Sequence, residues 1–435
     1  MVNKFTFLFL LLIGALNVAA QDAVKQRVIL IGDAGEMDLQ QAEVLKHATG
    51  KIIGGKTVVI YLGDNIYPRG MGLPGSPEEK KTQDILRSQY QPFRTAGAPV
   101  YFVPGNHDWD RMGPLGLAKI KAQWAFLNNQ QDSLLKMVPR DGCPDPVEIN
   151  MGDSLTIIAF DSEWFLYTHN KQNPDAQCDC NTRDEVLAKI QELYVKNRGK
   201  VILLAAHHPF QTYGTHGGYF SLKDHIFPLT AVKKNLFIPL PVIGSLYPLL
   251  RTLFINPEDT GHPLYKDMIN DVDGVFGGYP NLIHVAGHEH GLQFIKDKEV
   301  QVVSGAGAKN TYAKKGKNAL FADATQGYVT ADLLAGNNMQ FTYYIVTPTG
   351  VQQAFTYTQK YTEVKEWEAT NEAIQGDSTI VKVRPSYNDV GGFHRFLFGE
   401  NYRQEWAAAV KLPIIRLSEI HGGLTPAQLG GGLQS

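Results

Sequence analysis

The sequence predicts an α/β fold in which a sheet is buried on both faces and the chain finishes in antiparallel strands. Helix-like stretches at 38–49, 79–94 and 183–197 separate apolar runs that lack polar alternation: RVILIG (27–32), TVVIYLG (57–63), PVYFVPG (99–105) and VILLAAH (201–207). Strands without a polar face belong to sheets covered on both sides. After residue 290 the pattern changes to hairpins, from LQFIKDKEVQVVSG to GYVTADLLAGNNMQFTYYIVTPTGVQQAFTY.

Two further apolar runs, SLTIIAFD (154–161) and NLIHVAGH (281–288), extend the predicted sheet. The 435 residues, 43% of them hydrophobic, are enough for one large globular domain with additional segments. The net charge of -2, without a basic stripe interleaved with aromatic residues, excludes the electrostatic footprint of nucleic-acid binding or of an anionic membrane surface.

The first twenty residues, MVNKFTFLFLLLIGALNVAA, predict a secretory signal peptide that is cut before Gln21. Lys4 supplies the positive end, a mostly apolar run follows, and Val18 and Ala20 suit the cleavage positions. A membrane anchor is the weaker alternative, because the run is shorter than the roughly 20 residues that span a bilayer. In an exported chain we expect Cys143 to form a disulfide with Cys178 or Cys180, which leaves one thiol over.

Residues of the types that bind metals follow the ends of five predicted strands. Ligands collect beyond the carboxyl ends of the strands in such sheets, so we expect these side chains to meet. Carboxylate, amide and phenolate oxygens are hard ligands and imidazole is intermediate. The candidates exceed what one ion needs, so we expect two ions about 3.5–4 Å apart that share Asp64 as a bridge. The predicted metal ligands are Asp33, Asp64, Tyr67, Asn106, His207, His288 and His290.

The blocks that carry these ligands are GDAG, GDNIY, GNHD, AAHH and GHEH, in this order along the chain. They resemble the signature of the calcineurin-like metallophosphoesterases, and more narrowly that of the purple acid phosphatases of mammalian type: DxG, GDxxY, GNH[DE], VxxH and GHxH. The fourth block departs from the pattern by having Leu204 in place of Val. Most metallophosphoesterases have a histidine where this chain has Gly35, and the loss of that ligand together with the gain of Tyr67 marks the purple subclass.

The resemblance implies a four-layer α/β/β/α sandwich with mixed sheets, and it divides the ligands between two ions. The phenolate of Tyr67 favours a trivalent first ion, Fe³⁺, and the second ion is then Zn²⁺, Fe²⁺ or Mn²⁺. The implied ligands are Asp33, Tyr67, His290 and the bridging Asp64 for the first ion, and Asn106, His207, His288 and Asp64 for the second.

The resemblance also assigns catalytic roles. His107 is expected to contact phosphate and to protonate the leaving group, and Asp108 to orient His107 through a hydrogen bond. His216, in TYGTHGG, is similar in place to a second active-site histidine of the mammalian-type enzymes. The resemblance also selects His207, and not the adjacent His208, as the ligand.

For three other residues near these blocks, a structural role is weighed against a functional one. Trp109 either lines the substrate pocket or packs in the core, and the sequence does not decide between them. Asp161 and Glu163 are expected to end a strand and cap a loop.

We divide the chain into the signal peptide (1–20), a catalytic domain (24–362) with an inserted cap or lid at 217–280, and a C-terminal extension or linker (363–435). The run LFIPLPVIGSLYPLLRTLFI (236–255) contains three prolines and Arg251, so it is not expected to span a membrane. It packs on the core, covers the site, or rests on a membrane or another subunit. The tail contains NYRQEW, then IIRL, GGLTP and GGG. In these features it resembles a segment that joins secreted phosphoesterase domains to outer-membrane barrels in some Gram-negative bacteria; a flexible extension is the alternative.

The sequence therefore predicts an exported binuclear phosphatase that acts on small phosphate monoesters through in-line attack of a metal-bound hydroxide. Its location would be periplasmic, outer-membrane-associated or extracellular. Two alternatives remain open: a phosphodiesterase or nucleotide hydrolase of the same superfamily, and an auxiliary domain of an outer-membrane assembly.

Overall fold

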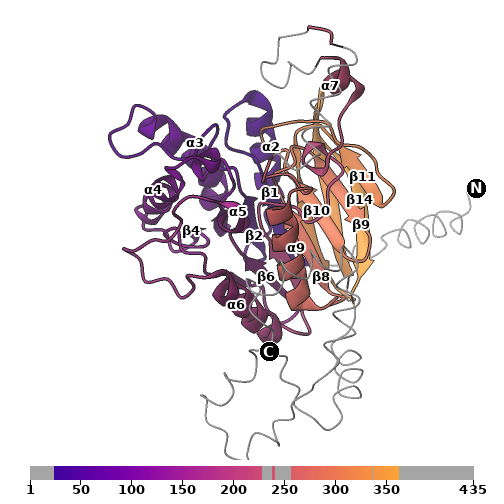
Figure 1. The fold of residues 1–435 in the computed structure, drawn as a ribbon. Coiled ribbons are helices and arrows are strands. Elements are labelled where there is room, and N and C mark those ends of the chain that lie inside the picture. The colour runs from indigo at the N-terminus through magenta and orange to yellow at the C-terminus, as the bar shows by residue number, and fades with distance from the viewer. Residues whose placement is uncertain (1–23, 228–237, 241–255, 337, 362–435) are drawn as a thin grey trace, which may run out of the picture. The chain divides into compact units, whose positions relative to one another are not determined.

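The computed structural model describes residues 24–227, 238–240, 256–336 and 338–361, which form two seven-stranded sheets with helices on their outer faces (Figure 1). The first sheet contains, in spatial order, β14 (Gly350–Lys360), β13 (Asn338–Thr347), β12 (Gly327–Leu334), β1 (Val24–Ile31), β2 (Thr57–Leu62), β3 (Val100–Val103) and β4 (Leu135–Met137). The second contains β11 (Ala319–Asp323), β9 (Leu292–Lys296), β10 (Val300–Ser304), β8 (Leu282–Ala286), β7 (Val201–Ala205), β6 (Leu155–Ala159) and β5 (Val147–Asn150).

Both sheets are mixed. Strands β1 to β4 run parallel, and β12, β13 and β14 continue that sheet in antiparallel pairs. In the second sheet β6, β7, β8 and β10 are parallel, whereas β5, β9 and β11 are antiparallel to their neighbours. The parallel strands carry the uninterrupted apolar runs and the hairpins follow residue 290, as the sequence pattern predicts.

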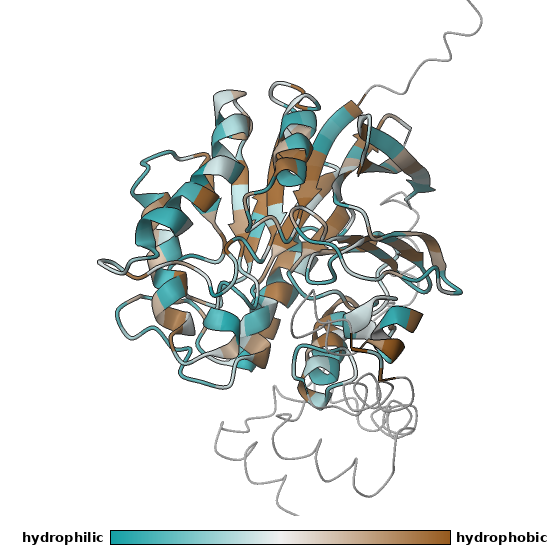
Figure 2. Ribbon diagram, turned by 90° about the horizontal axis from the view of Figure 1, so that it is seen from above, coloured by the Kyte–Doolittle hydropathy of each residue, from teal (hydrophilic) through white to brown (hydrophobic). Residues whose placement is uncertain are grey.

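The core lies between the two sheets. Leu30 and Ile60 of the first sheet and Leu203 and Val285 of the second belong to one cluster of buried side chains. Figure 2 shows apolar residues gathered on the central strands and hydrophilic residues on the outer helices. Each full burial of such an aliphatic side chain is worth roughly 1.5–3 kcal/mol. The α/β/β/α order of layers that the sequence predicts is confirmed.

Helices α2 (Leu39–Thr49) and α3 (Glu79–Thr95) cover the first sheet, and α5 (Ser162–Leu166), α6 (Arg183–Lys196) and α9 (Pro263–Phe276) pack together over the second. The predicted helices at 38–49, 79–94 and 183–197 match α2, α3 and α6. Side-chain caps fix two of their starts: Asp38 accepts from the Gln41 N–H, and Thr182 with Glu185 forms a capping box. Helices α4 (Gly116–Asn128) and α7 (Leu222–Ile226) and two 3₁₀ turns, η1 (Asp110–Met112) and η2 (Thr215–Gly217), complete the described helices.

The expected disulfide joins Cys143 to Cys178, whose Cα atoms are 5.4 Å apart, and leaves Cys180 as a buried free thiol. The bond fastens the loop after β4 to the segment that leads into α6.

Several predictions fall outside the described residues: the signal peptide at 1–20, the extension at 363–435 and most of the apolar run at 236–255. Within the described part of the 217–280 segment, α9 buries Tyr265, Met268, Val272 and Phe276. No helix in the described part of the chain is long and apolar enough to cross a membrane.

Candidate metal centre

The predicted ligands lie in the loops that follow β1, β2 and β3 of the first sheet and β7 and β8 of the second. A first group forms around Tyr67, whose hydroxyl donates to Asp33 Oδ1 at 2.9 Å and lies 3.1 Å from His290 Nε2. Asp33 Oδ1 and His290 Nε2 are themselves 3.4 Å apart. Three donor atoms from three distant loops therefore face one point.

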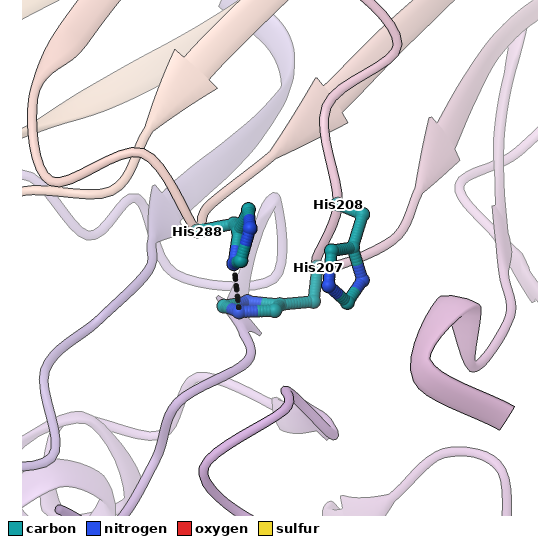
Figure 3. A group of neighbouring side chains, drawn as sticks. All are labelled: His207, His208 and His288. Carbon is teal, nitrogen blue, oxygen red and sulfur yellow. Dashed lines mark hydrogen bonds between the residues drawn. The ribbon is translucent and has the colours of Figure 1, made fainter. Parts of the chain in front are cut away.

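A second group forms around His207 Nε2, which is 3.0 Å from Asn106 Oδ1, 3.3 Å from Asp64 Oδ1 and 3.2 Å from His288 Nδ1. Figure 3 shows the rings of His207 and His288 turned toward each other, with His208 on the side. The N–H groups of the His207 and His288 rings point away from the space between the two rings. His207 Nδ1 donates to the carbonyl of Leu62 at 2.8 Å, and His288 Nε2 donates to the carbonyl of Glu258 at 2.8 Å.

The remaining nitrogens, His207 Nε2 and His288 Nδ1, consequently present lone pairs to each other across 3.2 Å. Two neutral imidazoles gain nothing from such an approach unless a cation lies between them. Both rings are buried, and burial first, then the neighbouring histidines, lowers the pKa of His288 well below its usual value. The second group therefore favours a bound cation over a proton.

Asp64 lies between the two groups. Its Oδ1 is 3.3 Å from His207 Nε2, and one of its carboxylate oxygens lies within 4.8 Å of a carboxylate oxygen of Asp33. Burial alone would raise the pKa of Asp64, but His107, His207 and His290 outweigh it and lower that pKa. Asp64 therefore stands close to donor atoms of both groups.

The backbone at the site adopts a conformation that L-residues rarely take. Asp33, Asp64 and His288 have φ angles of 57°, 53° and 65°. Each such residue costs on the order of 1–3 kcal/mol, which the surrounding structure must offset. The conformation turns the chain sharply at the end of β1, β2 and β8 and directs these three side chains inward.

Gly35 explains why Tyr67 reaches the site. A Cβ at Gly35 would lie 2.5 Å from the nitrogen of Ile66 and 2.6 Å from the carbonyl carbon of Asn65, so no side chain fits there. The Tyr67 N–H donates to the Gly35 carbonyl at 2.9 Å. The turn at 64–67 packs directly on this glycine. The backbone position that brings Tyr67 to the site therefore requires that residue 35 has no side chain.

His107 and His216 both border the two groups. His107 donates from Nδ1 to the carbonyl of Pro68 at 2.6 Å, and its Nε2 is 3.8 Å from Asp64 Oδ2. His216 Nδ1 is 2.8 Å from Asp259 Oδ1, and its ring centroid is 3.9 Å from that of His288. The structure thus brings both predicted catalytic histidines to the site.

The role predicted for Asp108 is wrong. Its carboxylate makes no hydrogen bond with His107 and instead accepts from the backbone N–H groups of Gly105, Asn65 and Ile66 at 2.8–3.1 Å. The sequential neighbour of His107 points into the protein, where it ties the loop after β3 to the loop after β2. Asp108 is a scaffold residue of the site, and the Pro68 carbonyl orients His107.

Residues 26–236 match the model of the family described as calcineurin-like phosphoesterase. The chain is also similar to tartrate-resistant acid phosphatase type 5 of Rattus norvegicus, with 23% identity over 231 residues that cover 51% of this chain and 67% of the rat protein. A hydrolase of the phosphoesterase family is the class of enzyme that these similarities support.

Two solved structures resemble the fold. Purple acid phosphatase PPD1 from yellow lupin seeds has a TM-score of 0.49 at 15% identity, with 79% of this chain and 55% of that chain covered. GAP50, the anchor in the inner membrane complex of Plasmodium, has a TM-score of 0.45 at 16% identity, with 84% of this chain and 98% of that chain covered.

The donor set fits the two ions that calcineurin-like phosphoesterases bind. Each of the two groups offers three or more oxygen and nitrogen donors, and Asp64 lies close to both. Asp33, Asp64 and His207 each place one donor atom within 4.8 Å of the others. Oxygen-rich sites of this kind suit hard or intermediate cations.

Two residues at the phosphoesterase site carry no sequence signal. Glu258 is 8% exposed, burial raises the pKa of its carboxyl, and its carbonyl accepts from His288 Nε2 at 2.8 Å. Lys309 Nζ lies 4.5 Å from the Tyr67 ring centroid and pairs with Glu36, and burial lowers its pKa. Neither residue belongs to one of the five blocks, so only spatial proximity identifies them.

Trp109 is a packing residue. It is fully buried, stacks at an angle on Tyr167 and donates from Nε1 to Asp161 Oδ2 at 2.8 Å. Asp161 also caps α5 by accepting from the Trp164 N–H at 3.1 Å, which confirms the predicted capping role. Burial raises the pKa of Asp161 to about 7.

His208 and Glu163 lie behind the site. His208 Nδ1 is 2.8 Å from the hydroxyl of Ser162, and its Nε2 is 3.7 Å from Glu163 Oε2. One ring nitrogen of His208 also lies within 4.8 Å of a ring nitrogen of His207 and of His288. The His208 ring nevertheless lies beside the other two rings and not between them (Figure 3).

Proposed function

We propose that this chain is an exported binuclear metallohydrolase that hydrolyses small phosphate monoesters. The observation that carries the proposal is the division of buried donors into two groups with Asp64 close to both, and with Tyr67 in only one of them. A phenolate donor on one side favours Fe³⁺ there, and the histidine-rich side suits Zn²⁺, Fe²⁺ or Mn²⁺. The rat relative, an acid phosphatase by name, supports a monoester substrate.

Once bound, two such cations neutralise the charge of a phosphate group and lower the pKa of a coordinated water. Asp33, Tyr67 and His290 would hold one of them, Asn106, His207 and His288 would hold the other, and Asp64 would contact both. The second nitrogens of His207 and His288 are already fixed by backbone carbonyls, so these ligands need no reorganisation to bind.

His107 would transfer the proton to the leaving group. Its Nδ1–H is held by the Pro68 carbonyl, so Nε2 is the nitrogen that faces the site, and the side chain is 16% exposed at its entrance. Proton transfer from a positioned imidazolium contributes typically about 10²–10⁴-fold to a rate. His216, held by Asp259, would contact the phosphate from the second-ion side.

The test combines metal analysis with an aryl phosphate assay. We expect near two ions per chain, and hydrolysis that Asp64→Ala abolishes. Protein that takes up no metal would contradict the enzyme proposal. Activity on an aryl phosphodiester but not on the monoester would favour the phosphodiesterase alternative.

Export is supported by the signal-peptide pattern at 1–20 and by the Cys143–Cys178 disulfide, since such bonds persist in oxidising compartments. Fractionation of the native host tests it: we expect recovery outside the cytoplasm. Recovery with the outer membrane would support the proposed role of the C-terminal tail.

A further inference from the structure

A cluster of three side chains of metal-binding type lies outside the two donor groups. It contains His284 of β8, Asp273 of α9 and Glu299, which directly precedes β10. His284 Nε2 is 2.7 Å from Glu299 Oε2 and 3.2 Å from Asp273 Oδ1. One donor atom of each residue lies within 4.8 Å of those of the other two. None of the three belongs to the five sequence blocks.

The second sheet determines where this cluster forms. Ile283 and Val285 belong to the core between the two sheets, so His284, which stands between them in β8, points to the outer face. Strand β10 runs parallel to β8 with Gln301 opposite His284, so Glu299, two residues earlier, lies on the same face. Helix α9 covers this face (Figure 1) and adds the third side chain.

We propose that Asp273, His284 and Glu299 form a separate binding site for a borderline divalent cation such as Zn²⁺, which fastens α9 and the start of β10 to β8. One imidazole and two carboxylates are ligands that Zn²⁺ accepts, and water would complete the coordination. The inference is independent of the proposed phosphatase function, because no residue of the two donor groups takes part in it.

The charges of the cluster leave room for a cation. A protonated imidazole brings one positive charge to two carboxylates, whereas Zn²⁺ bound by a neutral imidazole balances both. No lysine or arginine of the described residues lies within ion-pair distance of Asp273 or Glu299. His284 Nε2 carries at most one proton, which Glu299 Oε2 accepts at 2.7 Å. Asp273 Oδ1 is buried and receives no hydrogen bond from the described residues, which is unfavourable without a cation.

The distances are close to those of a zinc site. Zn–N and Zn–O bonds of about 2.0–2.1 Å place neighbouring ligand atoms of a tetrahedral site roughly 3.3 Å apart. The 3.2 Å between His284 Nε2 and Asp273 Oδ1 matches this spacing. Glu299 Oε2, at 2.7 Å, would move outward, where its side chain reaches the surface. The Asp273 side chain is 35% exposed, so solvent reaches the cluster and can supply the remaining ligands.

The experiment is a Zn²⁺ titration of chelator-stripped protein at about pH 8, because a histidine must lose its proton to bind a metal. Competition with a chromophoric chelator gives the affinities. We expect one equivalent beyond those of the proposed catalytic centre. Glu299→Gln and Asp273→Asn should each weaken this equivalent by about 100-fold or more, since loss of even a partner behind a ligand costs about 10–100-fold. Both variants should keep the wild-type kcat for an aryl phosphate.

A background with a disrupted catalytic centre isolates the cluster. In Asp64→Ala the additional equivalent should remain at unchanged affinity, and its binding should raise the midpoint of urea unfolding. Adding Glu299→Gln to this background should remove both the binding and the shift. Asp297→Asn is the matched control: it removes the charge of an exposed carboxylate in the same turn between β9 and β10 and should change neither.

Zn²⁺ binding that Asp64→Ala abolishes completely would overturn the inference and leave the cluster as an ion pair. An additional equivalent that survives in both Glu299→Gln and Asp273→Asn would also overturn it. The two substitutions lie on different elements, so a folding defect in one leaves the test to the other. An equivalent lost with Glu299→Gln, in a wild type that hydrolyses no aryl phosphate, would support the inference and overturn the proposed function, so the two failures are distinguishable.

Discussion

Tyr67→Phe is the sharpest test of the metal assignment, because it removes one buried oxygen and nothing else. That oxygen donates to Asp33 Oδ1 at 2.9 Å and lies 3.1 Å from His290 Nε2, and the residue is 8% exposed. The phenylalanine ring fills the same volume, so no cavity forms. The change deletes the phenolate from the first group and leaves the second group untouched.

The stability cost in metal-free protein is expected to be small. A hydrogen bond to a charged group contributes about 1.5–3 kcal/mol. Asp33 and His290 nevertheless remain partners at 3.4 Å, and Asp33 Oδ2 keeps the His288 N–H at 2.8 Å, so no buried group is left unpaired. We therefore expect a loss near the lower limit, about 1.5 kcal/mol in the free energy of unfolding, measured with urea.

The effect on colour should be complete. A ferric ion bound by Tyr67 gives a tyrosinate-to-iron absorption in the visible range, and Tyr67→Phe should abolish it while far-ultraviolet circular dichroism stays unchanged. Tyr61→Phe is the matched control: Tyr61 is also buried and donates to the Gln89 carbonyl at 2.8 Å, outside the site. A visible band that survives in Tyr67→Phe would refute the assignment. A colourless wild type with two Zn²⁺ or Mn²⁺ ions would keep the hydrolase and refute the ferric ion.

Three further substitutions test other parts of the site and fold. His107→Ala should lower kcat for an aryl phosphate by about 10²–10⁴-fold with unchanged metal content, and an unchanged kcat would exclude it as the proton donor. Asp108→Ala should lower the free energy of unfolding by about 3 kcal/mol or more in urea, because several buried N–H groups lose their acceptor; lost kcat with unchanged stability would restore a catalytic role. His284→Gln should destabilise the protein more at about pH 6 than at about pH 9. Burial alone would lower the pKa of His284, but Asp273 and Glu299 outweigh it and raise that pKa, so its contribution is present below the unfolded pKa and is lost as pH rises through the folded one. An equal loss at both pH values in urea unfolding would contradict this.

The sequence predicted the strands and the ligands for one physical reason. A parallel strand buried on both faces appears as an uninterrupted apolar run, and its end is visible as a glycine or small residue followed by a polar one. Asp33, Asp64 and His207 each follow such a run. Since the carboxyl ends of neighbouring parallel strands share an edge of the sheet, the placement of these residues in one site followed without coordinates.

The sequence was less informative about the directions in which individual side chains point. Asp108 is adjacent to His107, and adjacency suggested a hydrogen bond between them, but consecutive residues in a turn point to different sides. The backbone N–H groups that Asp108 accepts from are fixed only when the loops after β2 and β3 pack together. For the same reason Trp109 could not be assigned until its Nε1 was seen to donate to Asp161.

The sequence by itself determined the apolar strands, the residues at their ends and the exchange of a side chain at Gly35 for Tyr67, because these depend on local pattern and on the chemistry of each side chain. Only the tertiary structure decided which nitrogens of His207 and His288 face each other, that the Glu258 carbonyl accepts from His288, and that Asp108 ties the loops after β2 and β3 together. Those facts depend on contacts between residues 30 to 145 positions apart, and such contacts leave no periodic signal in the chain.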